Sequence, residues 1–246
     1  MKIVAIIPAR YESSRFPGKL LAQLGNKPVI KHVFDGTKNS GLFDDIIVAT
    51  DDQRIFETVD DFGGKVVLTA KEHQSGTDRI AEVCSKIDCD VIVNIQGDEP
   101  FISSEPLRKL VSVFDDKTIG IASLMHEIKK HIDNPNSVKV VCDKDNFALY
   151  FSRSLIPFNR DAEISHFQYL KHIGVYAFRK HILEKFVSLP EGKLEKIEKL
   201  EQLRLLENCI KIKMVQTEYE GIGIDTPEDL VRAELLLKKK MRISQY

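Results

Sequence analysis

Residues 3–19 read IVAIIPARYESSRFPGK, and the fold is inferred from this stretch outward. Residues 3–7 are apolar without interruption, which is typical of a strand buried on both faces of a parallel sheet. Three cations follow within ten positions of one loop: Arg10, Arg15 and Lys19. Gly18 lies beside the last of them, where a residue without a Cβ permits a backbone conformation that other side chains hinder. The stretch therefore predicts a buried strand that leads into a cationic loop.

A cationic loop suits a polyphosphate ligand, because guanidinium and ammonium groups neutralise phosphate oxygens and guanidinium adds paired donors. A solvated surface loop is the alternative. Two familiar phosphate motifs are absent from the sequence. It contains no G-x-x-x-x-G-K-[ST], and Gly221-Ile222-Gly223 is followed by Thr226 where the dinucleotide fingerprint needs glycine. A nucleotide site in this chain would therefore be of another type.

Composition limits the class of protein. The chain has 246 residues, enough for one large domain or a domain with a smaller lobe. Lys and Arg total 36 against 37 acidic residues, whereas a protein that binds chiefly DNA or RNA usually has a basic excess. We therefore expect a small anionic ligand and no nucleic-acid partner.

The cysteines and the apolar runs indicate a cytoplasmic protein. No C-x-x-C pair or zinc-type spacing with histidine occurs among Cys84, Cys89, Cys142 and Cys209. Free thiols in a reducing compartment are the simplest interpretation. The run at residues 3–7 is too short for a signal peptide or a membrane span, and no other stretch is long enough. We expect no membrane partner.

Short apolar runs alternate with amphipathic segments in the first half. Strands are expected at residues 46–50, 65–68 and 91–95, and helices are expected to begin near Asp51-Asp52 and Thr77. This alternation predicts an α/β fold with a mostly parallel sheet covered on both faces. Ligands of such sheets bind beyond the carboxyl ends of the strands. The segments that we expect to share a site there are the cationic loop, the region of His73, and Gln96-Gly97-Asp98.

The second half is less regular. Expected elements are strands at 137–142, 148–152 and 171–179, a helix at 194–208 and a half-exposed strand at 210–214. A last helix is expected after Thr226, with Thr226 as its cap and Pro227 in its first turn. We expect one domain over residues 1–246, with a lobe at about 128–215.

Two aspartates are candidate magnesium ligands. Asp98 follows a predicted strand at the same sheet edge as the cationic loop. Asp225 precedes a helix that Thr226 can cap, which leaves its carboxylate free for another task. Magnesium prefers one or two carboxylates together with substrate phosphates and water. The alternatives are that the Asp98 carboxylate hydrogen-bonds to its own backbone in a turn, and that the Asp225 charge interacts favourably with the helix dipole.

Other polar residues could line binding pockets. Gln74 and Ser75 precede a helix, where amides and hydroxyls can hold a base or a ribose, although a plain capped helix start is the alternative. A second group could bind a polyhydroxylated acid: Arg153, His172, Tyr176, Glu201 and Gln202. The alternative interpretations are a surface position for Arg153, a His172 ring that is hydrogen-bonded within the protein, and a solvent-exposed helix face that carries Glu201 and Gln202.

Several motifs together resemble those of the 3-deoxy-D-manno-octulosonate (Kdo) cytidylyltransferase family. They are the PARYESSRFPGK loop, ATDD at 49–52, HQSGTDR at 73–79, NIQGDEP at 94–100, ALYFSR at 148–153, KHIGVY at 171–176, LEQLR at 200–204 and GIDTPED at 223–229. The matches occur in order over nearly the whole chain. No departure from the family occurs at the phosphate or metal positions, whereas the stretch from Arg160 to Phe167 is less typical.

The resemblance implies a nucleotidyltransferase-type three-layer α/β sandwich with a mixed, mostly parallel sheet. It also implies a smaller lobe that binds sugar and forms a homodimer. The implied reaction is CTP plus Kdo giving CMP-Kdo and pyrophosphate, with Mg²⁺, for lipopolysaccharide biosynthesis. Another sugar acid, such as 8-amino-Kdo, or a non-catalytic nucleotide-binding protein remains an alternative, although the presence of both Asp98 and Asp225 argues against the latter.

The resemblance also implies residue roles. It implies that Arg10, Arg15 and Lys19 hold the triphosphate, and that Asp98 and Asp225 bind magnesium. Arg10, Lys19 and the two aspartates are the implied catalytic group. The implied contacts to cytosine or ribose come from Ala9, Gln74 and Ser75, and Gln96 lies close to the substrates. The implied sugar pocket consists of Arg153, His172, Tyr176, Glu201 and Gln202.

Overall fold

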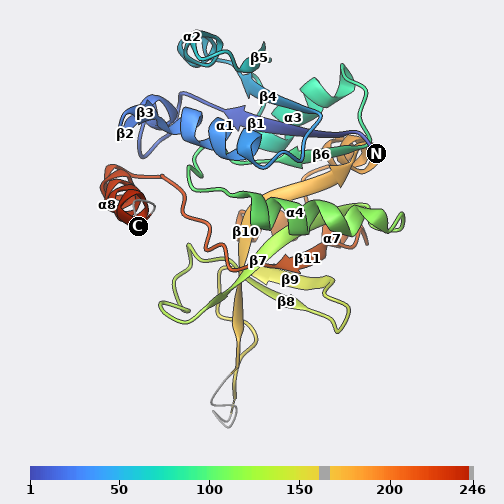
Figure 1. Ribbon diagram of the computed structural model, residues 1–246. Coiled ribbons are helices and arrows are strands. Elements are labelled where there is room, and N and C mark those ends of the chain that lie inside the picture. Colours follow the sequence, from blue (N-terminus) through green and yellow to red (C-terminus); the bar gives the residue numbers. More distant parts are fainter. Residues whose placement is uncertain (161–166, 244–246) are drawn as a thin grey trace. The chain divides into compact units, whose positions relative to one another are not determined.

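The computed structural model describes residues 1–160 and 167–243 (Figure 1). The chain forms two compact units, one of Met1–Leu107 with Gly221–Tyr246 and one of Arg108–Glu220. The division falls within helix α4 (Ser104–Ser112). The lobe expected at 128–215 lies inside the second unit, which begins earlier and ends later. Residues 161–166 of the stretch that is less typical of the family lie outside the described residues.

The first unit contains four parallel strands in the order β6 (Val91–Asn94), β1 (Ile3–Ala9), β4 (Asp45–Thr50) and β5 (Lys65–Leu68) (Figure 1). Every residue of β1 is buried, as expected for a strand with a neighbour on each side and both faces covered. Ala9 aligns with Thr50, and Thr50 aligns with Leu68, so these strands end at one edge. The four strands predicted from the apolar runs are confirmed.

Helices α1 (Val29–Asn39), α2 (Gln53–Asp61) and α3 (Gly76–Ser85) connect these strands. The chain crosses from β1 to β4 to β5 in one direction and returns to β6, so right-handed crossovers place α3 on the face opposite α1 and α2. The remaining elements of this unit are the 3₁₀ helix η1 (Lys19–Leu21), the hairpin of β2 (Gln23–Leu24) and β3 (Lys27–Pro28), and α8 (Pro227–Ile243).

Side-chain caps set the helix starts. Asp52 caps α2 by accepting a hydrogen bond from the Arg54 amide at 2.9 Å. Ser75 and Asp78 form a capping box at the start of α3. Thr226 caps α8, since its Oγ1 accepts from the Asp229 amide at 3.2 Å. The predicted helix starts are confirmed. The Asp225 amide donates to Asp229 at 3.2 Å, whereas the Asp225 carboxylate takes no part in the cap.

The second unit has a mixed sheet in the order β11 (Lys213–Gln216), β7 (Ile121–Ile128), β10 (Tyr169–Arg179), β8 (Lys139–Cys142) and β9 (Ala148–Ser152). Only the β11–β7 pair among these is parallel. The other elements are η2 (Val113–Asp115), α5 (Lys180–Ser188), α6 (Lys193–Glu198) and α7 (Leu203–Glu207). No helix within the described residues is long and apolar enough to cross a membrane.

The continuous helix predicted at 194–208 is wrong. Helix α6 ends at Glu198, where Lys199 adopts a left-handed conformation, and α7 begins at Leu203. Arg204 forms two hydrogen bonds with the buried Glu195, at 2.6 and 2.8 Å. Nine residues of one helix would separate these two positions by about 13.5 Å along its axis, so the ion pair requires the turn.

The strand predicted at 210–214 begins later. Strand β11 covers Lys213–Gln216, where it pairs with β7. Before it, the carbonyl of Ile212 accepts a hydrogen bond from the Ala148 amide at 2.9 Å, so this part of the chain is bound to the start of β9 instead.

Candidate active site

The cationic loop that follows β1 is closed at its base. The Gly18 amide donates to the Tyr11 carbonyl at 2.8 Å, and Gly18 has a φ of +72°. This positive φ favours glycine, and a Cβ there would also crowd the Tyr11 ring at 3.0 Å. The Arg54 guanidinium lies over the Tyr11 ring, 3.2 Å from the ring centroid, and Arg54 is hydrogen-bonded in turn to Asp52. The start of α2 therefore holds the loop.

The loop that follows β6 places Asp98 beside the end of β1. A Cβ at Gly97 would lie 2.9 Å from the Pro8 carbonyl oxygen, so only glycine lets the two chain segments approach this closely. The carbonyl of Asp98 accepts a hydrogen bond from the Ile224 amide at 2.9 Å. This bond joins the end of β6 to the segment before α8, which carries Asp225.

Asp98 and Asp225 meet at one cation. The Lys19 ammonium donates to Asp98, and it donates to Asp225 Oδ1 at 2.9 Å. Arg15 forms an ion pair with the other oxygen of Asp225, at 3.0 Å. The Lys19 side chain is 13% exposed, and Asp98 and Asp225 are 25% and 45% exposed. The structure thus brings together four of the predicted residues, from three separate segments.

The protonation of this cluster follows from its contacts. Burial alone would lower the pKa of Lys19, but the charges and hydrogen bonds of Asp98 and Asp225 outweigh burial and raise it. Burial would likewise raise the pKa of Asp225, and the hydrogen bonds and charges of Lys19 and Arg15 reverse this and lower it. At neutral pH the cluster therefore holds an ammonium, a guanidinium and ionised Asp225.

Arg10 is fixed through a second chain of contacts. Its Nη2 donates to the His73 carbonyl at 2.6 Å. The His73 ring lies 2.7 Å from Glu82 Oε2, and the same oxygen accepts from the Ala70 amide at 2.9 Å. Hydrogen bonds from Lys86, Ala70 and His73 lower the pKa of Glu82 to about 2. A charged carboxylate on α3 therefore holds the segment that orients Arg10.

Two cavities adjoin the cationic loop. One has a volume of about 330 Å³ and is lined by Pro8, Arg10, Glu12, Ser13, Ser14, Arg15, Lys19, Leu20, Gly76, Gln96, Gly97 and Asp98. The other, of about 810 Å³, is lined by Arg10, Tyr11, Glu12, Ser13, Ser14, Pro17, Asp51, Asp52, Arg54, Lys71 and His73. Both volumes are typical of small-molecule sites.

The predicted base and ribose contacts line neither cavity. Ala9 is fully buried at the end of β1. Gln74 is exposed, and its amide donates to the Glu72 carbonyl at 2.9 Å. The Ser75 hydroxyl donates to Asp78 Oδ2 at 2.9 Å and accepts from the Asp78 amide at 3.0 Å. Any contact of Ser75 with a ligand would therefore compete with the capping box of α3.

In the second unit, His172 and Tyr176 share one face of β10. Their ring centroids lie 5.3 Å apart, although four residues of a regular strand span about 13 Å. The register of β10 with β7 shifts between Ile173 and Tyr176, and this irregularity brings the rings closer. The Ser123 hydroxyl lies 3.0 Å from His172 Nε2. Burial, with a smaller effect of the Lys171 charge, lowers the pKa of His172 to about 3, so His172 acts as a neutral imidazole.

Glu201 and Gln202 lie in the turn between α6 and α7 rather than on one helix. Burial, followed by the charge of Glu201, raises the pKa of Tyr176 well above its ordinary value. Gln202 is 6% exposed, and among the described residues its Nε2 finds no hydrogen-bond partner. A buried donor without a partner is costly, so this amide is a candidate contact for a ligand.

Arg153 is bound by main-chain carbonyls. Its Nε donates to the Glu198 carbonyl at 2.7 Å, Nη1 donates to Pro135 at 3.1 Å, and Nη2 donates to Lys199 at 3.3 Å. Within the described residues Arg153 forms no ion pair, so its charge is not offset by a carboxylate in contact.

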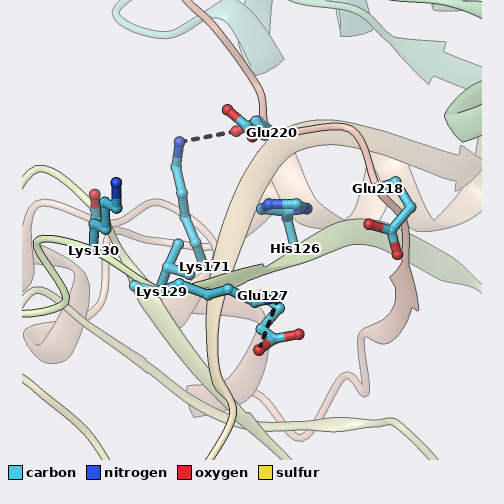
Figure 2. Close-up of a pocket in the computed structure, with 9 residues that line it drawn as sticks. His126, Glu127, Lys129, Lys130, Lys171, Glu218 and Glu220 are labelled. Carbon is cyan, nitrogen blue, oxygen red and sulfur yellow. Dashed lines mark hydrogen bonds and ion pairs between the residues drawn. The ribbon is translucent and has the colours of Figure 1, made fainter.

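A further cavity of about 520 Å³ lies in the second unit. It is lined by His126, Glu127, Ile128, Lys129, Lys130, Ser137, Lys171, Glu218 and Glu220. Figure 2 shows the Lys171 side chain reaching toward Glu220, whose carbonyl accepts its hydrogen bond at 3.1 Å. Its three lysines and three glutamates balance in charge, and none of the predicted site residues lines it.

Several residues of these sites were not predicted from the sequence. Ser13 and Ser14 line both cavities of the first unit, and their place within the cationic loop is a signal that could have indicated this. Arg54 and Ser123 have no such signal, because each meets its partner only through the fold.

Comparisons with known proteins show the family to which the chain belongs. Residues 4–212 match a family described as Cytidylyltransferase. The 3-deoxy-manno-octulosonate cytidylyltransferase of Flavobacterium johnsoniae is 53% identical over 243 residues, which cover 97% of this chain and 99% of that protein. The protein of the same name from Thermodesulfovibrio yellowstonii is 50% identical over 252 residues, covering 96% and 98%.

Solved structures give the same result. The structure of CMP:2-keto-3-deoxy-manno-octonic acid synthetase complexed with CTP matches with a TM-score of 0.94 and 41% identity, covering 98% of this chain and 100% of that chain. The 4-diphosphocytidyl-2C-methyl-D-erythritol synthase of Anaerococcus prevotii matches at 20% identity with a TM-score of 0.66, which shows a shared fold alone. The α/β nucleotidyltransferase-type fold expected from the sequence is confirmed. The chain belongs to the 3-deoxy-manno-octulosonate cytidylyltransferase family.

Proposed function

We propose that this protein transfers a cytidylyl group from CTP to Kdo, releasing pyrophosphate. The observation that carries the proposal is the meeting of Asp98 and Asp225 at Lys19, beside a loop that supplies two further cations. Relatives at about half identity over nearly the full chain are named for this reaction, and a close structural neighbour is described as a complex with CTP.

The residue roles follow from charge and position. Arg10, Arg15 and Lys19 neutralise the triphosphate, whose oxygens match guanidinium and ammonium donors. Gln96 lines the same cavity as these cations, so we assign it a contact with the bound substrates. The family resemblance supports nucleoside contacts for Ala9, Gln74 and Ser75.

Asp98 and Asp225 would hold Mg²⁺. Among the described residues no group of three or more histidine, cysteine or acidic side chains could hold a metal. Two converging carboxylates nevertheless fit magnesium, which takes its other ligands from phosphates and water. When bound, the ion would neutralise phosphate charge as it develops during transfer.

The sugar acid would be bound by residues of the second unit. Arg153 offers an uncompensated guanidinium for its carboxylate. Gln202 offers a buried amide donor, and His172, Tyr176 and Glu201 offer further partners for hydroxyl groups.

In the reaction the C2 hydroxyl of the sugar attacks the α-phosphorus in line with the departing pyrophosphate. Positioning and electrostatic stabilisation account for most of the catalysis.

We also propose a cytoplasmic homodimer. Large apolar side chains of the second unit are exposed to solvent in the single chain, and they include Leu149 at 61%, Phe158 at 80% and Ile197 at 80%. Large apolar side chains that are exposed in the single chain suit burial at an interface with a second copy. All four cysteines are free, as suits a reducing compartment.

The test is a panel of nucleoside triphosphates and sugar acids with pyrophosphate release as the readout, with and without Mg²⁺. We expect release only with CTP, Kdo and the metal together. A higher kcat/KM with 8-amino-Kdo or another sugar acid would correct the substrate. No release with any pair, despite CTP binding, would indicate a non-catalytic nucleotide-binding protein.

A further inference from the structure

Lys139 is a fully buried lysine, and the hydrogen bonds of its ammonium within the described residues go to two main-chain oxygens. Its Nζ donates to the Arg153 carbonyl at 2.6 Å and to the Asn134 carbonyl at 3.0 Å. Lys139 pairs with Ser152 across strands β8 and β9, and its side chain extends to the residue that follows Ser152. That residue is Arg153, at the point where the chain leaves the sheet.

Glu198 holds the same residue from the other side. Its carboxylate accepts from the Arg153 amide at 3.0 Å and from the Ser152 hydroxyl at 2.6 Å. The Glu198 carbonyl accepts from Arg153 Nε at 2.7 Å. The main chain of Arg153 is thus bound at its N–H by Glu198 and at its C=O by Lys139.

Packing alone does not require a lysine at this position. A buried ammonium without a carboxylate in contact is costly, and an apolar side chain of similar length would fill the space without burying a charge. What lysine adds is a pair of strong hydrogen bonds to two carbonyls. One of these carbonyls belongs to the residue whose guanidinium has no ion-pair partner in the described part of the chain.

We propose that Lys139 and Glu198 are positioning residues, which fix the main chain of Arg153 so that its guanidinium meets the carboxylate of the sugar acid. This inference rests on the proposed role of Arg153 in sugar binding. It assigns neither Lys139 nor Glu198 a contact with the substrate. Both act through the placement of Arg153.

The test compares KM for Kdo, KM for CTP and kcat in the intact enzyme and in the variant Lys139→Met. Because small displacements of a binding group are costly, we expect KM for Kdo to rise about tenfold while KM for CTP changes less than about twofold. The exposed Lys144 lies in the turn between β8 and β9, and Lys144→Met is the matched control, with no change expected.

A double-mutant cycle separates positioning from a general structural effect. In an Arg153→Ala background, Lys139→Met should cause no further rise in KM for Kdo. Additive effects, an unchanged KM for Kdo in Lys139→Met, or an equal rise in both KM values would overturn the proposal.

Two further outcomes are distinguishable. If Arg153→Ala alone leaves KM for Kdo unchanged, the proposed role of Arg153 fails, and the positioning role fails with it. If Lys139→Met does not fold, Glu198→Gln decides the matter. This variant keeps the shape of the side chain and removes its charge, and a selective rise in KM for Kdo would support the proposal, whereas unchanged kinetics would overturn it.

Discussion

Lys19 donates a hydrogen bond to Asp225 at 2.9 Å, although the two residues lie 206 positions apart in the sequence. The same ammonium binds Asp98, so one cation offsets the repulsion between two carboxylates. The free protein therefore holds both aspartates at one place before any ligand arrives. Preorganised charge of this kind reduces the reorganisation that the reaction requires.

Replacing Arg54 should weaken CTP binding without removing any ligand contact that we assign. Arg54 stacks on Tyr11 and so holds the cationic loop against α2. An exposed cation–π contact is worth ~0.5–1 kcal/mol, so Arg54→Ala should raise KM for CTP by about two- to fivefold. The measurement is the CTP dependence of pyrophosphate release at saturating Kdo. Equal effects of Arg54→Ala and Tyr11→Ala would be consistent with one shared contact, and an unchanged KM in both would contradict it.

Replacing Gln202 should weaken the binding of Kdo without lowering the stability of the folded protein. Its buried Nε2 has no hydrogen-bond partner in the described part of the chain, and such a group costs ~1–3 kcal/mol, so Gln202→Leu should unfold at the same or a higher urea concentration. The same variant should raise KM for Kdo, because the donor for a sugar hydroxyl is lost. The exposed Gln216→Leu serves as a control for both measurements. A destabilised Gln202→Leu with normal KM would show that the amide has a structural partner.

The imidazole of His172 should stay neutral down to acid pH. Burial and the Lys171 charge lower its pKa to about 3, whereas an unfolded histidine titrates near 6.5. Between these values the unfolded chain binds a proton that the folded chain does not, so stability falls as the pH drops below 6.5, by at most ~1.4 kcal/mol per pH unit. His172→Gln should reduce this slope in urea unfolding, and the exposed His181→Gln should not. NMR titration of His172 near pH 6.5 would contradict the prediction.

Breaking the Glu195–Arg204 pair should destabilise the turn between α6 and α7. The two side chains are 8% and 13% exposed, and removal of one partner from a buried pair costs ~3–5 kcal/mol. Glu195→Gln should therefore unfold at a much lower urea concentration. Glu191 forms a half-exposed ion pair with Lys196 at 3.6 Å, so Glu191→Gln should cost less than ~1 kcal/mol. Equal losses in the free energy of unfolding for the two variants would mean that burial does not determine how much the Glu195–Arg204 ion pair contributes to stability.

Local patterns were sufficient to predict the sheet of the first unit. Strand β1 and its neighbours are short apolar runs, and each is bounded by polar residues that end it. The rule that loops after parallel strands share one edge then predicted that Asp98 would lie near the cationic loop. Asp225 was predicted as a site residue from its position before a capped helix and from the family resemblance. In the structure its carboxylate is hydrogen-bonded to Lys19.

The rest depends on contacts that no local pattern reveals. Leucines at three-residue steps indicated one helix over 194–208, but the Glu195–Arg204 ion pair requires a turn within it. Arg54 and Tyr11 lie in separate segments of the chain, and Lys139 and Arg153 lie 14 positions apart, so each pair forms only when the segments that carry it have come together. Such contacts position the site residues and do not themselves bind a ligand. A search for ligand-binding sequence motifs therefore does not detect them.

The most direct test of the account is the magnesium dependence of pyrophosphate release from CTP and Kdo in Asp98→Asn and Asp225→Asn. Asparagine keeps the size of the side chain and removes the charge that would hold the ion. We predict that each variant folds normally and loses at least ~100-fold in kcat, and that the exposed Asp88→Asn is unaffected. Wild-type rates and wild-type magnesium dependence in either aspartate variant would contradict it.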